Sequence, residues 1–142
     1  MSELARAAYT LARRQHWCCI WCEFEMASTY GRAEQMLRHE LPAGAPPIAR
    51  EVMHRAAQAI VVSFDHFDPR AAGGADCIEN GFASCRWCNV YRATEDPLVF
   101  KGKVAALVAA GRHPRQILRA TGNWPRHEQY RAIALVASGA VA

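Results

Sequence analysis

The sequence predicts a single α+β domain in which helices surround one short β-hairpin. Apolar residues recur with helical spacing in both halves of the chain, whereas β-branched and aromatic residues gather at 60–64. Two Cys-x-x-Cys pairs, Cys19–Cys22 and Cys85–Cys88, bracket this β-rich stretch. A chain of 142 residues has room for one domain, so residues 1–142 are expected to form one unit.

The N-terminal half is predicted to be mainly helical. Ser2 can cap a first helix within residues 1–16, which carries apolar side chains on one face. A second helical pattern runs from about 32 to 41, and a loop rich in proline and glycine ends it. A third helix is expected to end near Ile60, because apolar residues repeat every four positions before it. Residues 23–60 are therefore a predicted helical insertion.

The middle of the chain is predicted to form a hairpin followed by a helix. The run 60–64 predicts the first strand, and Gly73-Gly74 marks the turn of the loop that follows. A returning strand is expected at 80–84, and a helix is expected from Asn89 onward. Together these elements make up a predicted core at 61–95.

The remaining residues, 96–142, are predicted to form a helical C-terminal extension. Pro97, Pro114 and Pro125 each stand where a helix can begin. Two interpretations of these helices remain open: a helix-turn-helix that reads DNA, or helices that pack on the core. Packing is favoured, because no base-reading side chains stand out and helix pairs are common.

The paired cysteines predict a structural metal site. Thiolates are soft ligands that suit Zn²⁺, and two tight Cys-x-x-Cys turns can share one tetrahedral ion. The competing interpretation is that the thiols are merely buried. Four protein ligands leave no open coordination position, so this Zn²⁺ is expected to be structural. The predicted ligands are Cys19, Cys22, Cys85 and Cys88, with Cys18 and Cys77 outside the pattern.

A second group of residues carries oxygen and imidazole chemistry. The carboxylate of Asp65 is a hard ligand that suits Mg²⁺ or Mn²⁺. His66 points to the opposite side of an extended strand, and histidine is the usual general base near neutral pH. Asn89, directly after the second cysteine pair, can supply a neutral second metal ligand.

This order of residues resembles the HNH nuclease motif, the ββα-metal (His-Me finger) fold of homing endonucleases and many phage and bacterial nucleases. The resemblance extends from Cys19 to about Arg92. Two features depart from the motif: the long segment 23–64, and the absence of the usual lysine after Asn89, where Val90-Tyr91-Arg92 stands. The matching residues are Asp65-His66, Pro69, Gly73-Gly74, Asn80, Cys85, Cys88 and Asn89.

The resemblance implies a role for each motif residue. His66 would activate a water molecule, and Asp65 and Asn89 would hold one divalent cation at the scissile phosphate. Asn80 would form hydrogen bonds within the loop that carries His66 and fix its orientation. The nearby candidates for phosphate contacts are Arg70, Arg86 and Arg92.

The leading hypothesis is therefore a metal-dependent HNH endonuclease that hydrolyses phosphodiester bonds in DNA. One alternative is a catalytically inactive, zinc-stabilised module that binds nucleic acid or protein. Another is a nuclease toxin, or a nuclease subunit of a larger defence or mobile-element system. A protein partner would bind through the helical insertion at 23–60.

Charge and hydropathy add weaker expectations. The formal charge of +4 is too small to argue for nucleic acid on its own. The N-terminus has no apolar signal core, and no apolar run is long enough to span a bilayer. A cytoplasmic location and no membrane partner are expected.

Overall fold

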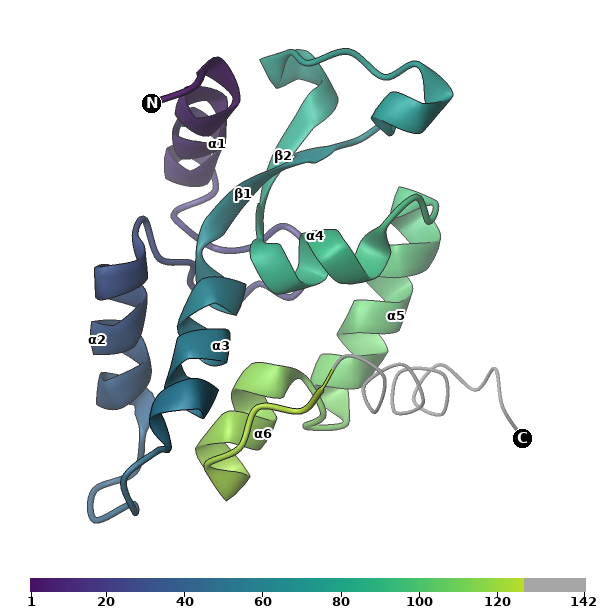
Figure 1. Ribbon diagram of the computed structural model, residues 1–142. Helices are drawn as coiled ribbons and strands as arrows, with labels where there is room; N and C mark the ends of the chain where they lie inside the picture. The colour runs from purple at the N-terminus through teal and green to yellow at the C-terminus, as the bar shows by residue number, and fades with distance from the viewer. Residues whose placement is uncertain (127–142) are drawn as a thin grey trace.

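The computed structural model describes residues 1–126, and the helix expected after Pro125 falls on 127–142, outside the described residues. A two-stranded antiparallel sheet lies among helices, which confirms the α+β class (Figure 1). The elements are α1 (Glu3–Arg14), α2 (Tyr30–Glu40), α3 (Arg50–Ile60), β1 (Val62–His66), β2 (Gly81–Cys85), α4 (Arg86–Arg92), α5 (Pro97–Ala109) and α6 (Pro114–Thr121), with 3-10 turns at Arg70–Ala72 and Ile78–Asn80.

Several element boundaries differ by a few residues from the sequence prediction, and two of these differences bear on the site. The strand expected at 60–64 is β1 at Val62–His66, because Ile60 completes the last turn of α3 and is buried there. The helix expected from Asn89 begins earlier, at Arg86. Cys85 caps it, because its Sγ accepts a hydrogen bond from the Cys88 N–H at 3.4 Å. The cysteine pair thus forms the first turn of α4.

The β-hairpin has a fixed register that places the candidate site residues. Val62 pairs with Cys85 at one end, and His66 pairs with Gly81 at the other. A Cβ atom at Gly81 would lie 2.2 Å from the Phe64 ring, so any other residue at this position would have to displace that ring. The histidine therefore lies at the loop end of the hairpin, and Cys85 lies at the end next to α4.

The two ends of the helical insertion lie side by side. The Ala27 N–H donates to the Ile60 carbonyl at 3.0 Å, and the Val62 N–H donates to the Ala27 carbonyl at 2.9 Å. Between these contacts, α2 and α3 run side by side (Figure 1). The long segment between the first cysteine pair and β1 therefore forms a closed helical hairpin, and the strand starts beside the residues that precede this hairpin.

The helices and the hairpin share one hydrophobic core. Phe100, Val104 and Leu107 of α5 are buried in the same cluster as Leu118 of α6 and the cysteines. The described part of the C-terminal extension packs against the rest of the domain, in line with the favoured interpretation of 96–142. No helix within residues 1–126 combines the length and apolarity needed to cross a membrane.

Candidate metal centre and candidate active site

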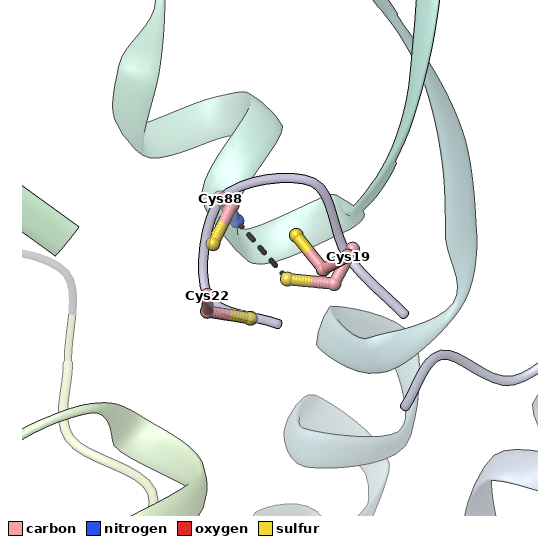
Figure 2. Close-up of side chains that lie close together, drawn as sticks. Cys19, Cys22 and Cys88 are labelled. Carbon is pink, nitrogen blue, oxygen red and sulfur yellow. Dashed lines mark hydrogen bonds between the residues drawn. The ribbon is translucent and has the colours of Figure 1, made fainter. Parts of the chain in front are cut away.

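The four paired cysteines converge on one buried point. Their sulfur atoms lie within 4.8 Å of one another, although the two pairs are far apart in the sequence. Figure 2 shows how the Cys19–Cys22 turn and the start of α4 bring these side chains together. The Trp21 N–H donates to Cys19 Sγ at 3.4 Å, matching the contact between Cys88 and Cys85 in the other turn. Each pair therefore sits in a tight turn in which a backbone N–H donates to one of the two sulfur atoms.

The electrostatics of the cluster favour a bound cation. Hydrogen bonds from Cys19, and then from Cys85 and Cys88, hold the pKa of the Cys22 thiol far below its usual range. The pKa values of Cys85 and Cys88 are raised, in Cys85 chiefly by its contact with Cys19 and in Cys88 chiefly by burial. A divalent ion would stabilise all four as thiolates, so this buried cluster could bind a structural metal such as zinc.

His66 is held by an acidic residue that the motif did not identify. His66 Nε2 lies 2.7 Å from Asp76 Oδ1, and the histidine side chain is 16% exposed. Arg70 donates two hydrogen bonds to the same carboxylate, from Nε to Oδ1 at 2.8 Å and from Nη2 to Oδ2 at 2.9 Å. The hydrogen bonds from Arg70, and then from His66, lower the pKa of Asp76. Asp76 therefore links the end of β1 to the loop that follows it. No spacing pattern in the sequence pointed to Asp76.

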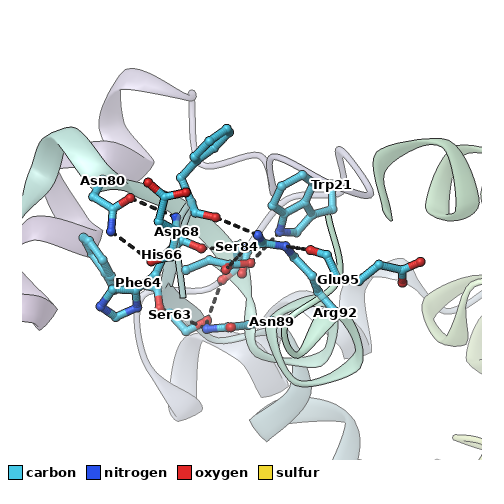
Figure 3. A network of polar contacts seen from close by, with 12 residues as sticks. Trp21, Ser63, Phe64, His66, Asp68, Asn80, Ser84, Asn89, Arg92 and Glu95 are labelled. Atoms are coloured by element: carbon cyan, nitrogen blue, oxygen red, sulfur yellow. Dashed lines mark hydrogen bonds and ion pairs between the residues drawn. The ribbon is translucent and has the colours of Figure 1, made fainter. Parts of the chain in front are cut away.

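Asn80 closes the loop that follows His66. Its Oδ1 accepts a hydrogen bond from the Asp68 N–H at 2.9 Å, and its Nδ2 donates to the carbonyls of Asp68 at 3.1 Å and Ala75 at 2.9 Å. Gly74 allows this closure, because a Cβ there would lie 1.7 Å from the Asp68 carbonyl oxygen. Figure 3 shows Asn80 beside Asp68 and His66. These hydrogen bonds are of the kind that the HNH resemblance implies for this asparagine.

Asp65 is buried on the other face of β1 and both of its oxygens are engaged. Oδ1 lies 2.6 Å from Arg92 Nη1, and Oδ2 accepts a hydrogen bond from Trp21 Nε1 at 2.7 Å. Burial raises the pKa of Asp65, against the opposing effects of Trp21 and Arg92. The same guanidinium donates to the backbone carbonyls of His66, Phe67 and Glu95.

This network corrects the expectation for Arg92. The arginine was a candidate for phosphate contact, but it is only 2% exposed and its donors are used inside the protein. Arg86 and Arg70 are exposed, and Arg70 is already paired with Asp76. Of the three candidate arginines, Arg70 and Arg86 are therefore the two that are open to solvent.

Asn89 lies one helical turn before Arg92 and also faces β1. Its Nδ2 donates to Ser63 Oγ at 3.1 Å and to the Phe64 carbonyl at 3.0 Å. Asp65 and Asn89 therefore tie the strand to α4, and Asp65 does so through Arg92. Figure 3 shows Asn89 and Arg92 on this side of the strand. As the side chains stand, they do not fit a cation held between Asp65 and Asn89. Within residues 1–126, the cysteine cluster is the one group of three or more potential ligands of the His, Cys, Asp and Glu types.

Comparison of the chain with protein-family models, with curated proteins and with solved structures finds no significant match. The HNH resemblance therefore rests on the motif residues themselves. The hairpin and α4 bring His66, Asn80 and Asn89 into one region (Figure 3). Sequence reasoning missed Asp76 and Trp21 as partners of this region.

Proposed function

We propose that this chain is an endonuclease of the HNH type that hydrolyses phosphodiester bonds in DNA. The observation that carries the proposal is the pairing of His66 with Asp76 at the loop end of the hairpin, where Asn80 holds the loop closed. A partly exposed imidazole beside a carboxylate is an arrangement suited to general-base catalysis.

The hydrogen bond to Asp76 selects one tautomer of His66. Because Nε2 faces the carboxylate, the proton lies on Nε2, and Nδ1 is left as the acceptor. In the proposed reaction, Nδ1 removes a proton from a water molecule whose oxygen attacks phosphorus. The bond from phosphorus to the leaving oxygen breaks, and the leaving oxygen takes a proton from solvent water. Asp76 stabilises the imidazolium that forms. Asp76 is thus a positioning residue for His66.

Positive charge for the phosphate backbone is proposed to come from the exposed arginines. Arg86 stands in the first turn of α4, and Arg70 lies on the loop beside Asp76. A guanidinium can contact phosphate through two parallel N–H donors. Arg70 would in this case bridge the substrate and the carboxylate that holds His66.

The divalent cation belongs to the proposal through the resemblance alone. Mg²⁺ or Mn²⁺ on Asp65 would displace the Arg92 guanidinium from a buried ion pair. We therefore assign Asp65 to the ion pair and derive no catalytic step from a cation at this position. The dependence of cleavage on Mg²⁺ or Mn²⁺ is part of the test.

The ion pair between Asp65 and Arg92 favours a second candidate function. A module that uses the motif residues only to hold strand and helix together would bind nucleic acid or protein without cleaving it. Such a module would retain the cysteine cluster and the loop of Asn80, since both are structural. Tight DNA binding by the purified protein, with no turnover under any metal, would support this candidate over the nuclease.

The test is cleavage of supercoiled plasmid DNA in the presence of Mg²⁺, Mn²⁺ or a chelator. We expect His66→Ala to reduce the rate by at least about 100-fold, the contribution typical of a general base. His39→Ala is the matched control, because His39 is exposed on α2, and it should cleave like the wild type. Equal rates for the wild type and His66→Ala, or no cleavage by the wild type, would overturn the proposal.

A further inference from the structure

A buried histidine of the C-terminal extension lies next to the cysteine cluster. His113 is 1% exposed and forms the N-cap of α6, where its Nδ1 accepts a hydrogen bond from the Arg115 N–H at 3.2 Å. Gln116 completes the cap, since its Oε1 accepts from the His113 N–H at 2.9 Å. The cap therefore gives Nδ1 of the imidazole ring a hydrogen-bond partner but gives none to Nε2.

The other ring nitrogen, Nε2, is buried and makes no hydrogen bond within residues 1–126. Because Nδ1 accepts a backbone N–H, the ring proton lies on Nε2. A buried N–H donor without an acceptor is unfavourable, and native structures rarely contain one. The position of the ring shows which acceptor is available.

The ring of His113 is packed between the two cysteine turns. Its centroid lies 5.0 Å from the Trp87 ring, and Trp87 stands between Cys85 and Cys88. It lies 4.9 Å from the Phe24 ring, which follows Cys22. The His113 side chain also lies next to that of Cys22.

We propose that His113 is an outer-shell residue of the metal centre, which donates its Nε2–H to Cys22 Sγ and so joins α6 to the bound ion. The inference rests on the metal centre and not on nuclease activity. Hydrogen bonds from outside the ligand shell orient metal ligands and strengthen binding of the ion. A neutral histidine with its proton on Nε2 has the donor that a thiolate ligand accepts.

A second contact ties the C-terminal extension to the same cysteine turn. Lys101 Nζ donates to the carbonyls of Ile20 at 2.7 Å and Trp21 at 3.0 Å, both between Cys19 and Cys22. The Phe100 ring also meets the Trp21 ring edge to face, with centroids 5.4 Å apart. Helix α5 therefore fixes the backbone of this turn, and His113 at the start of α6 reaches its sulfur.

The test is the affinity for zinc, measured by competition with a chromophoric chelator. His113→Asn keeps an N-cap acceptor but is too short to reach Cys22, so we expect zinc affinity to fall by roughly 10–100-fold. Gln116→Ala is the matched control: it removes the other half of the cap and leaves the cysteines untouched, so zinc affinity should stay at the wild-type level. An affinity for His113→Asn equal to that of the control would overturn the inference.

Two spectroscopic readouts separate an outer-shell role from a purely structural one. In the Co²⁺-substituted protein, loss of a hydrogen bond to sulfur should shift the thiolate-to-cobalt charge-transfer band of His113→Asn to lower energy, and an unchanged band would count against the inference. Long-range ¹⁵N NMR of the wild-type protein needs no variant. It should find the His113 proton on Nε2, and a proton on Nδ1 would overturn the inference.

Discussion

Arg92 Nη1 lies 2.6 Å from Asp65 Oδ1, and both side chains are almost completely buried. The pair joins the end of β1 to the end of α4, and Trp21 from the first cysteine turn donates to the other carboxylate oxygen. The guanidinium of Arg92 also lies 5.1 Å from the centre of the Trp21 ring. The metal turn, the strand and the helix therefore meet at one carboxylate, so a change at Asp65 or Arg92 should affect the whole hairpin region.

Removal of Arg92 should destabilise the protein strongly. Arg92→Met leaves the buried carboxylate of Asp65 without its charge partner, so we expect the free energy of unfolding to fall by about 3–5 kcal/mol. Arg86→Met, on the exposed side of the same helix, should change it by no more than about 0.5 kcal/mol. Urea unfolding at a fixed zinc concentration measures both. Similar losses of unfolding free energy in the two variants would show that the ion pair between Asp65 and Arg92 does not stabilise the fold.

The pairing of Arg70 with Asp76 should be visible in the titration of Asp76. The pKa of Asp76 lies below its ordinary value of 3.8, chiefly because of Arg70, so Arg70→Ala should raise it towards that value. The sign follows from linkage: the pairing stabilises the folded loop above the unfolded pKa, and this contribution is lost as pH falls through the lower folded pKa. Carboxyl ¹³C NMR measures the shift. An Asp76 titration that is the same in the wild type and in Arg70→Ala would contradict the assignment.

Asn80 should control how often the loop after His66 opens. Asn80→Ala removes three hydrogen bonds, each worth roughly 0.5–1.5 kcal/mol, so exchange of the Asp68 amide hydrogen should accelerate by at least about tenfold. Asn80→Asp is the control, because it keeps the acceptor for the Asp68 N–H and loses only the two donor bonds, and it should show a smaller acceleration. Unchanged exchange in Asn80→Ala would mean that the loop is held by other contacts.

Replacement of one of the four clustered cysteines should prevent the protein from folding. Cys88→Ser replaces a buried cysteine at the start of α4, and we expect loss of the metal together with loss of cooperative unfolding, since metal-binding energy is folding energy in such sites. Cys77→Ser is the matched control, because Cys77 lies outside the cluster and should leave metal content and folding unchanged. Circular dichroism and metal analysis of both variants make the comparison. A Cys88→Ser protein that folds without metal would contradict the structural role.

The sequence predicted the features that depend on local spacing. The cysteine turns follow from Cys-x-x-Cys spacing, and the cap of α1 from Ser2, whose Oγ accepts the Ala5 N–H at 3.1 Å. The sequence did not predict the side-chain contacts that form only when the chain is folded. Arg92 was a candidate for phosphate contact because arginine is rarely buried unless paired, and its pair was unknown. No sequence motif pointed to Asp76 or His113. Asp76 contacts His66 across the loop, and His113 packs against Trp87 and Phe24 from another part of the chain.

The most direct measurement is X-ray absorption at the zinc edge, made together with metal analysis of the purified protein. The four-cysteine cluster lies where the first cysteine turn, the end of the hairpin and the start of α4 meet. We expect one zinc per chain with four sulfur ligands at about 2.3 Å. A nitrogen or oxygen ligand in place of one of the sulfurs, or folded protein that carries no metal after growth with zinc, would contradict it.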